Sequence, residues 1–324
     1  MRTLVALALL LACAPGRAWN DFGHMCAAAV AYDHLSEPAR CRALDLLRLN
    51  PDYGRWVRGI EPAEQGRIAF LRASAWADAI KHRRGYHDGP EANPGTAQEQ
   101  VLGYADLREH RRWHYIDLPY SPDGTPALPT PAPNLETELV ELRRGLASED
   151  LPPAVRSYEL VWLIHVVADA HQPLHTISRF TREFPAGDAG GNRVALCARP
   201  CRSDLHAFWD DVLGHSRSPR AALRLARTLP GASPALVARA KPSEWITESF
   251  DIARRAVYVE PIGPGPGPYA LTPQYRARAL HIARERIALA GERLAALLNR
   301  ALDSGSSGSA GSAGSAGAVS PPRE

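Results

Sequence analysis

The chain has 324 residues, of which 45% are hydrophobic and 23% are charged. This is the composition of a globular protein, and it excludes a collagen-like chain, a chain that is disordered throughout and a disulfide miniprotein. Lysine and arginine total 38 against 35 acids, which gives a net charge of +3. So small a charge provides no field over the whole molecule to attract a polyanion. Any affinity for phosphate or nucleic acid therefore has to come from a local site.

The first 18 residues are typical of a secretory signal. Arg2 precedes an apolar run over residues 4–14, and the small residue Ala18 stands before Trp19. The run is too short to span a bilayer. We expect an exported protein, periplasmic or secreted, in which cleavage makes Trp19 the first residue. In an alternative reading, residues 10–13 form a bacterial lipoprotein cleavage site that would lipidate Cys13.

Four cysteines remain after the leader, and an even number in an exported chain favours two disulfides. Local pairings, Cys26–Cys41 and Cys197–Cys201, are the preferred connectivity among three. A zinc site made of these four thiols is disfavoured, because no CxxC pair is present.

Apolar residues at helical spacing dominate the rest of the chain. They predict helices over residues 24–48, 134–147, 155–172, 203–213 and 243–258, and a last helix that begins at Pro273. The helix over 155–172 is apolar nearly all round, as expected at the centre of a bundle. A stripe from Leu280 to Ala301 should close the bundle. The sequence predicts an all-α fold, a single mostly helical domain over residues 19–302, and a disordered Ser/Gly/Ala-rich tail over 303–324.

Two of the predicted helices carry a histidine and an aspartate four residues apart, His165 with Asp169 and His206 with Asp210. Residues at this spacing share one helix face. An aspartate in an apolar helix is costly unless a partner compensates it. One such pair could be hydrogen-bonded core groups, but two pairs that face inward can converge on cations. Imidazole with carboxylate is a ligand set that suits zinc.

Further candidate ligands follow or precede these helices. His175 comes six residues after Asp169, and the segments 113–117 and 74–78 contribute His114 and Asp78 beside aromatic neighbours. At the expected new N-terminus, the α-amine and carbonyl of Trp19 could chelate a metal, because a free α-amine has a pKa near 8. Gly23 is expected to let the chain bend so that His24 reaches the same ion.

Six motifs occur in a fixed order between residues 19 and 210. They are a Trp with His five residues later, Trp-Ala-Asp, His-aromatic-Ile-Asp, His-x3-Asp-x5-His ending in Gln-Pro-Leu-His, Gly-Gly-Asn, and Leu-His-x2-Trp-Asp. With these motifs the chain resembles the zinc-dependent type I nucleases, a family of single-strand-specific nucleases and 3′-nucleotidases. The resemblance implies the helical fold of bacterial zinc phospholipase C.

The resemblance also implies three zinc ions per chain and nine ligands. The first ion would be held by Asp78, His114, His165 and Asp169. The second would be held by His175, His206 and Asp210. The third would be held by Trp19 and His24, with Asp169 as a bridge to the first.

The activity that the resemblance implies is cleavage of single-stranded DNA and RNA to 5′-phosphate products by a hydroxide that bridges the metals, with added 3′-nucleotidase activity. Asp78, Lys81 and Asp169 would be the catalytic residues. Lys81 would stabilise charge on the phosphoryl oxygens. Tyr115 would stack on an unpaired base, and Asp117 and Asn192 would bond its edge. The alternatives are a solvated surface lysine at position 81 and a core-packing tyrosine at 115.

Two other functions remain compatible with the same metals. A zinc phospholipase C or a general phosphomonoesterase would recognise phosphate in the same way, and only the base-binding residues favour nucleotides. A non-catalytic exported zinc-binding protein is the more remote alternative. We expect a monomer that acts on single-stranded DNA, RNA and 3′-nucleotides. Walker, HExxH, GxSxG and Rossmann signals are missing from the sequence.

Overall fold

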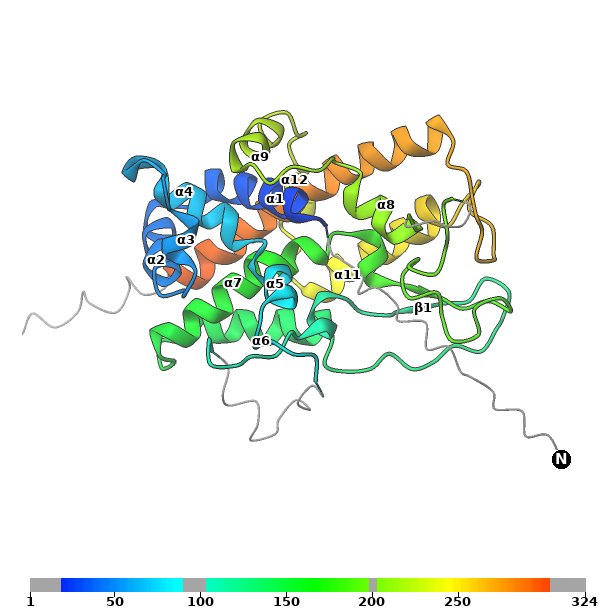
Figure 1. Ribbon diagram of the computed structural model, residues 1–324, viewed down its shortest axis with the longest axis horizontal. Helices are drawn as coiled ribbons and strands as arrows, with labels where there is room; N and C mark the ends of the chain where they lie inside the picture. The colour runs from blue at the N-terminus through cyan, green and yellow to red at the C-terminus, as the bar shows by residue number, and fades with distance from the viewer. Residues whose placement is uncertain (1–18, 90–102, 198–202, 304–324) are drawn as a thin grey trace, which may run out of the picture.

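A computed structural model describes residues 19–89, 103–197 and 203–303 (Figure 1). Its α-helices are α1 (Asp21–His34), α2 (Glu37–Leu47), α3 (Tyr53–Trp56), α4 (Pro62–Ala73), α5 (Trp76–Ala79), α6 (Leu135–Ala147), α7 (Pro153–Asp169), α8 (Leu205–Asp211), α9 (Pro219–Ala226), α10 (Pro234–Val237), α11 (Pro242–Ile252) and α12 (Pro273–Asp303). Short 3₁₀ helices are η1 (Ile80–His82), η3 (Arg111–His114) and η4 (Pro173–Thr176), and η5 (Ala253–Val257) is a π-helical turn. Two strands of two residues each, β1 (Pro119–Tyr120) and β2 (Ser178–Arg179), pair in parallel with Pro119 opposite Ser178. The predicted all-α fold is confirmed.

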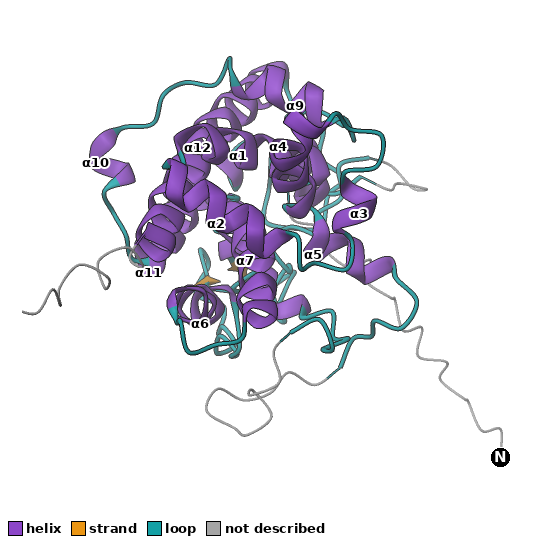
Figure 2. Cartoon of the chain, turned by 90° about the vertical axis from the view of Figure 1, so that its left-hand side faces the viewer, coloured by secondary structure: helices purple, strands orange, loops and turns teal. Residues whose placement is uncertain are grey.

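Helix α7 forms the centre of the bundle. Every residue from Ser157 to Asp169 is buried. Helices α2, α6 and α12 pack against α7, and the long α12 also runs along α1 (Figure 2). The apolar sequence of α7 thus predicted its central position. Because α7 is surrounded, side chains at its C-terminal end are shielded from water, and this is where His165 and Asp169 lie.

Two helix predictions need correction. The helix expected over 24–48 is broken, because Leu35 is extended and Ser36 starts α2 by accepting a hydrogen bond from the backbone N–H of Ala39. In α12, residues such as Ala283 and Ile287 are buried as expected, but Leu280 is 41% exposed. Leu280 lies at the edge of the buried face, so the interior stripe is shorter than the sequence suggested.

The predicted Cys26–Cys41 disulfide is wrong. Cys26 is buried on α1, with its Sγ 3.9 Å from the carbonyl oxygen of Ala222, whereas Cys41 is exposed on α2, and both are free thiols. Cys197 is disulfide-bonded. Its predicted partner, Cys201, lies outside the described residues, so that pairing stays a prediction.

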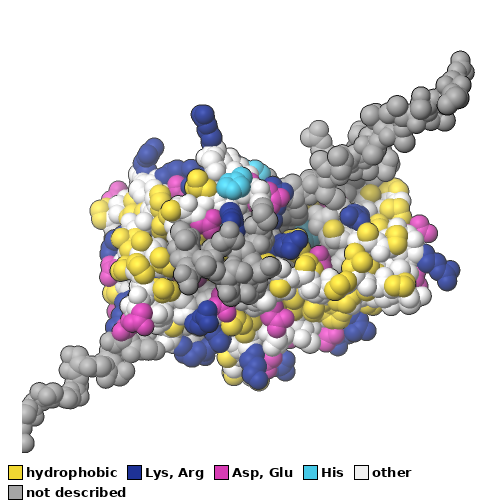
Figure 3. Space-filling model, turned by 90° about the horizontal axis from the view of Figure 1, so that it is seen from below, with side chains coloured by type: hydrophobic (Ala, Val, Ile, Leu, Met, Phe, Trp, Pro, Cys, Tyr) yellow, Lys and Arg dark blue, Asp and Glu magenta, His cyan; other side chains and the backbone are white. Residues whose placement is uncertain are grey.

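The leader and the tail also lie outside the described residues, and the domain bounds drawn from them stay predictions. Among the helices of the described ranges, none is both long and apolar enough to cross a bilayer. On the face shown in Figure 3, basic and acidic side chains are interspersed. This agrees with a net charge near zero, so substrate recognition has to depend on local geometry.

Candidate metal centre

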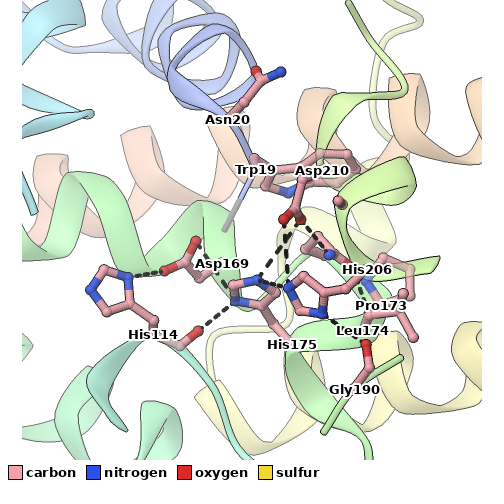
Figure 4. A network of polar contacts seen from close by, with 12 residues as sticks. Trp19, Asn20, His114, Asp169, Pro173, Leu174, His175, Gly190, His206 and Asp210 are labelled. Carbon is pink, nitrogen blue, oxygen red and sulfur yellow. Dashed lines mark hydrogen bonds and ion pairs between the residues drawn. The ribbon is translucent and has the colours of Figure 1, made fainter. Parts of the chain in front are cut away.

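The predicted ligands converge at the C-terminal end of α7 (Figure 4). Helix α7 supplies His165 and Asp169. The surrounding elements supply His24 from α1, Asp78 from α5, His114 from η3, His175 from η4, and His206 and Asp210 from α8. Segments far apart in the sequence therefore meet at one place, and three groups of ligand-type atoms form there.

The first group has the spacing of a four-coordinate ion. The Oδ2 atom of Asp169 lies 3.2 Å from both His114 Nδ1 and His165 Nε2, which are 2.9 Å apart. The Oδ1 atom of Asp78 lies 3.9 Å from each of these ring nitrogens. Atoms bound tetrahedrally at zinc–ligand distances lie about 3.3 Å from one another. The four side chains predicted for the first ion thus have a geometry that such an ion fits.

The other oxygen of the same carboxylate faces a different histidine. Asp169 Oδ1 lies 3.3 Å from His24 Nε2, and the ring of His24 stacks on that of His165 with centroids 3.8 Å apart. One buried carboxylate therefore contacts two ligand groups, as a bridging residue must.

The second group is formed by His175, His206 and Asp210. The Nε2 atoms of the two histidines are 3.2 Å apart, and Asp210 Oδ2 lies 3.6 Å from His206 Nε2. Asp210 Oδ1 lies 4.0 Å from His175 Nε2 and accepts a hydrogen bond of 2.7 Å from the amide of Gln172. These three side chains also point at a common position.

Buried atoms without partners indicate that cations belong here. His24 Nε2, Asp169 Oδ1 and Asp210 Oδ2 are buried and have no hydrogen-bond partner. A buried polar atom left unpaired costs free energy. Where two ring nitrogens about 3 Å apart both present lone pairs, a cation between them would also remove their repulsion. Divalent ions satisfy both requirements, so the residues fit a metal centre.

Backbone carbonyls orient three of the histidines. The Nδ1 atoms of His165, His175 and His206 lie 2.7, 2.6 and 2.7 Å from the carbonyl oxygens of Ser74, His114 and Gly190. A carbonyl can only accept, so in each ring Nδ1 carries the proton. Nε2 then carries the lone pair that can bind a metal, and outer contacts of this kind are typical of metal-binding histidines.

The electrostatics of three candidate ligands, His24, His114 and Asp78, favour metal binding. Burial, assisted by His165 for His24 and by Lys81 for His114, lowers the pKa of both imidazoles to about 3. Both rings are therefore neutral near pH 7, as ligation requires. Burial raises the pKa of Asp78, but Lys81 opposes this most strongly and the net pKa lies below the usual range. Burial holds the pKa of Asp210 well above its usual value, so this carboxyl favours its neutral form unless a nearby cation compensates.

Trp19 is held firmly beside the centre. Its side chain is fully buried, and its indole Nε1 donates to the carbonyl oxygen of Ala168, 3.1 Å away. The N–H of the next residue, Asn20, donates to the carbonyl oxygen of Asp210. The bend expected at Gly23 is wrong, because Gly23 lies inside α1. A Cβ there would be 2.9 Å from Trp19 Cβ, so Gly23 makes room for the indole.

Lys81 lies at the centre rather than on the open surface. Its side chain is only 6% exposed, and Nζ lies 2.8 Å from Asp78 Oδ1. The solvated-lysine alternative is therefore wrong, while a catalytic role stays a prediction.

The predicted base-binding residues lie along the segments that carry the ligands. Tyr115 directly follows His114 and is half-buried, so neither full core packing nor full exposure describes it. Burial, and then the charge of Asp188, raise the pKa of Asp117 to about 6. The amide nitrogen of Asn192 donates to the carbonyl oxygen of Ala189. Their roles toward a base stay predictions.

Sequence reasoning missed two residues that support the ligands. Gln172 bonds Asp210, and the carbonyl of Gly190 orients His206. Both lie in motifs noted above, Gln-Pro-Leu-His and Gly-Gly-Asn, but neither side-chain type suggests metal support. Only the fold shows what they contact.

Comparisons with known proteins give a family match and several relatives. The sequence model of the S1/P1 nuclease family matches residues 19–303. Two relatives from Arabidopsis thaliana, Endonuclease 3 and Endonuclease 5, are each 30% identical over 159 and 161 residues. The alignments cover 44% of this chain and 50% of each relative, so the chain spans about half the length of the curated relatives it matches.

Proposed function

The chain belongs to the S1/P1 nuclease family, and from this we propose that it is a zinc-dependent nuclease that hydrolyses single-stranded DNA and RNA to 5′-phosphate products. We further propose that it removes phosphate from 3′-nucleotides. The observation that carries the proposal is Asp169, a fully buried residue whose two carboxylate oxygens face different groups of histidines. Such an arrangement is suited to several ions held close together.

Zinc is proposed because of the donor set. Each group combines imidazole nitrogen with carboxylate oxygen, and among the described residues no cysteine takes part. When bound, such ions supply Lewis-acid activation of water and of a phosphoryl oxygen. The third ion of the proposal needs the α-amine of Trp19, so the proposal includes export and cleavage after Ala18. The match of the family model from residue 19 supports this boundary.

The residues of the chain then have separate tasks. Asp169 lies between two ligand groups, because each of its oxygens faces a different one. Lys81 holds a positive charge beside Asp78, at the edge of the first group, where it can stabilise charge that grows on a phosphoryl oxygen. Tyr115 offers an aromatic face to an unpaired base, and a duplex would hide that base face.

One set of assays tests the proposal. The exported protein is purified, its N-terminal residue is sequenced, and its bound zinc is counted. Hydrolysis is then measured on single-stranded DNA, duplex DNA, RNA, 3′-AMP and phosphatidylcholine vesicles. We expect an N-terminal tryptophan, three zinc ions per chain, and activity on the single-stranded and 3′-phosphate substrates. Activity on phosphatidylcholine alone would instead identify a phospholipase C.

Asp169→Asn provides the matched variant, because it keeps the shape of the side chain and removes its charge. We expect loss of bound zinc together with loss of hydrolysis. Asp251→Asn, at a partly exposed acid on α11, is the control for removal of an acid away from the site. An Asp169→Asn protein with full zinc content and full activity would refute the scheme.

A further inference from the structure

A buried ion pair lies behind the segment that connects η4 to α8. The side chain of Asp188 is 0% exposed. Its Oδ1 accepts hydrogen bonds from the backbone N–H of Arg179 at 2.9 Å and from the hydroxyl of Tyr258 at 3.1 Å. Its Oδ2 lies 3.3 Å from Arg179 Nε. The carboxylate is therefore fixed from several sides, although it is no part of the predicted metal or base sites.

Arg179 connects this carboxylate to the segment that contains Tyr258 and Gly263. Its guanidinium lies over the ring of Tyr258, 4.4 Å from the centroid, and its Nη1 donates to the carbonyl oxygen of Gly263 at 2.8 Å. The backbone N–H of Asp188 in turn donates to the carbonyl oxygen of Arg179. Asp188 is thus bonded both to β2, through Arg179, and to Tyr258, which follows η5.

An unusual turn follows directly. Ala189, Gly190 and Gly191 have φ angles of 53°, 59° and 84°, so three successive residues have left-handed backbone. This conformation is unfavourable for alanine. The turn also presses against η4, since a Cβ at Gly190 would lie 2.4 Å from the carbonyl oxygen of Leu174. Such a turn keeps its shape only if contacts outside it hold its ends.

Two backbone carbonyls of the turn accept hydrogen bonds from residues of the candidate site. The carbonyl of Gly190 accepts the hydrogen bond from His206 Nδ1, and the carbonyl of Ala189 accepts the one from the amide of Asn192. The first contact orients a predicted ligand of the second group. The second orients a residue predicted to contact the base. Asp188 is the buried anchor at the start of the turn, and the N–H of Arg193 donates to its carbonyl oxygen.

We propose that Asp188 is a positioning residue that acts through the turn 189–191 to set the orientation of His206 at the metal centre and of Asn192 at the base-binding site. The part that concerns Asn192 rests on the proposed function. The part that concerns His206 rests on metal binding alone. A single buried carboxylate would then couple zinc affinity to nucleotide recognition.

Asp188→Asn tests the metal part. The amide keeps the size of the side chain and removes the charge that pairs with Arg179. We expect the chain to fold and one zinc ion to bind about 10–100-fold more weakly, the usual effect of losing a contact behind a metal ligand. The measurement is zinc competition with a chromophoric chelator. Leu298→Ala is the control, because Leu298 is fully buried in α12 and its truncation destabilises the fold without touching the turn.

Kinetics test the recognition part. At saturating zinc, Asp188→Asn should recover kcat, while its KM for 3′-AMP stays about 3–10-fold raised, as expected when one hydrogen bond is weakened. The KM for ribose 3-phosphate, which has no base, should not change. If Asp188 had only a structural role, Asp188→Asn and Leu298→Ala would change the zinc affinity to the same extent. The ratio of the KM for 3′-AMP to the KM for ribose 3-phosphate would also be the same in both variants.

Tyr258→Phe removes only the hydroxyl and serves if Asp188→Asn fails to fold. It should weaken zinc binding in the same direction by a smaller factor. Zinc binding and KM values equal to those of Leu298→Ala would overturn the inference. Failure of the unaltered protein to bind zinc or hydrolyse any phosphoester would instead overturn the proposed function.

Discussion

Replacing Gly190 with alanine is predicted to damage the second ligand group through the backbone alone. Gly190 has a φ of 59°, and a Cβ there would lie 2.4 Å from the carbonyl oxygen of Leu174 and 3.3 Å from His206 Nδ1. The first contact is far shorter than atoms tolerate, and it involves backbone that cannot rotate away. The turn therefore has to move off η4, and the 2.7 Å hydrogen bond between Gly190 and His206 lengthens.

The substitution is expected to have two effects, one on folding free energy and one on zinc affinity. The left-handed backbone costs an alanine about 1–2 kcal/mol of folding free energy, and displacement of the turn adds to this cost. Loss of the carbonyl that orients His206 is expected to lower the affinity of one zinc ion by about 10–100-fold. We therefore expect Gly190→Ala to reduce the free energy of unfolding of the metal-free protein and the affinity for one of the three proposed zinc ions.

Two other glycines give matched controls. Gly59 and Gly124 have φ angles of 71° and 78°, and a Cβ at either meets no atom within 4 Å. Alanine at these positions carries the same backbone cost without the clash. Urea unfolding of the metal-free protein measures the loss of folding free energy. Competition with a chelator after zinc is added back measures the loss of zinc affinity. If Gly190→Ala binds all of its zinc as tightly as Gly59→Ala does, the Gly190 carbonyl does not orient a ligand and the reasoning fails.

Three further predictions concern other charged groups. Lys81→Gln should lower kcat by about 100-fold with zinc content unchanged, and a matching loss of zinc would show that Lys81 acts only on Asp78. Burial, and then Asp117's neighbour Asp188, raise the pKa of Asp117 to about 6, so its ionised, accepting form is lost below that pH. The KM for 3′-GMP should rise as pH falls through about 6, and Asp117→Asn should remove this dependence. Burial, and then Glu138, raise the pKa of Glu159 to about 8. A raised folded-state pKa contributes stability at low pH that is lost between the unfolded pKa near 4.5 and about 8, so from about pH 5 to 8 the protein should lose roughly 4 kcal/mol relative to Glu159→Gln. Equal pH profiles of urea unfolding for the two proteins would contradict this.

The central helix and the shared face of its histidine and aspartate were predictable because their physical signals are local. Residues 155–172 are apolar nearly all round, and a helix with that pattern is expected to be surrounded. His165 and Asp169 stand four residues apart, so they share a face whatever the remaining fold does. The structure adds that His114 and His24 reach the two oxygens of Asp169. Without the resemblance, that convergence could not be derived from spacing.

Other features depend on distant contacts and could not be predicted. Cys26 and Cys41 are near in sequence, but one faces the core and the other faces water, so local pairing was a poor guide. Gly23 was expected to bend the chain, yet its small size serves the indole of Trp19. In each case the sequence marked the residue as important, but its role depends on a contact with a different part of the chain.

The carbonyl contacts show how ligands from distant segments become one site. His165 bonds the carbonyl of Ser74, at the start of the segment that carries Asp78, and His175 bonds the carbonyl of His114 itself. The backbone of one ligand segment thus orients the side chain of another. A shift of η3 would therefore disturb His114 as a ligand of the first group and His175 as a ligand of the second at the same time. This mutual dependence predicts that the two groups lose their metal together when the backbone moves, even though most of their side chains belong to only one of them.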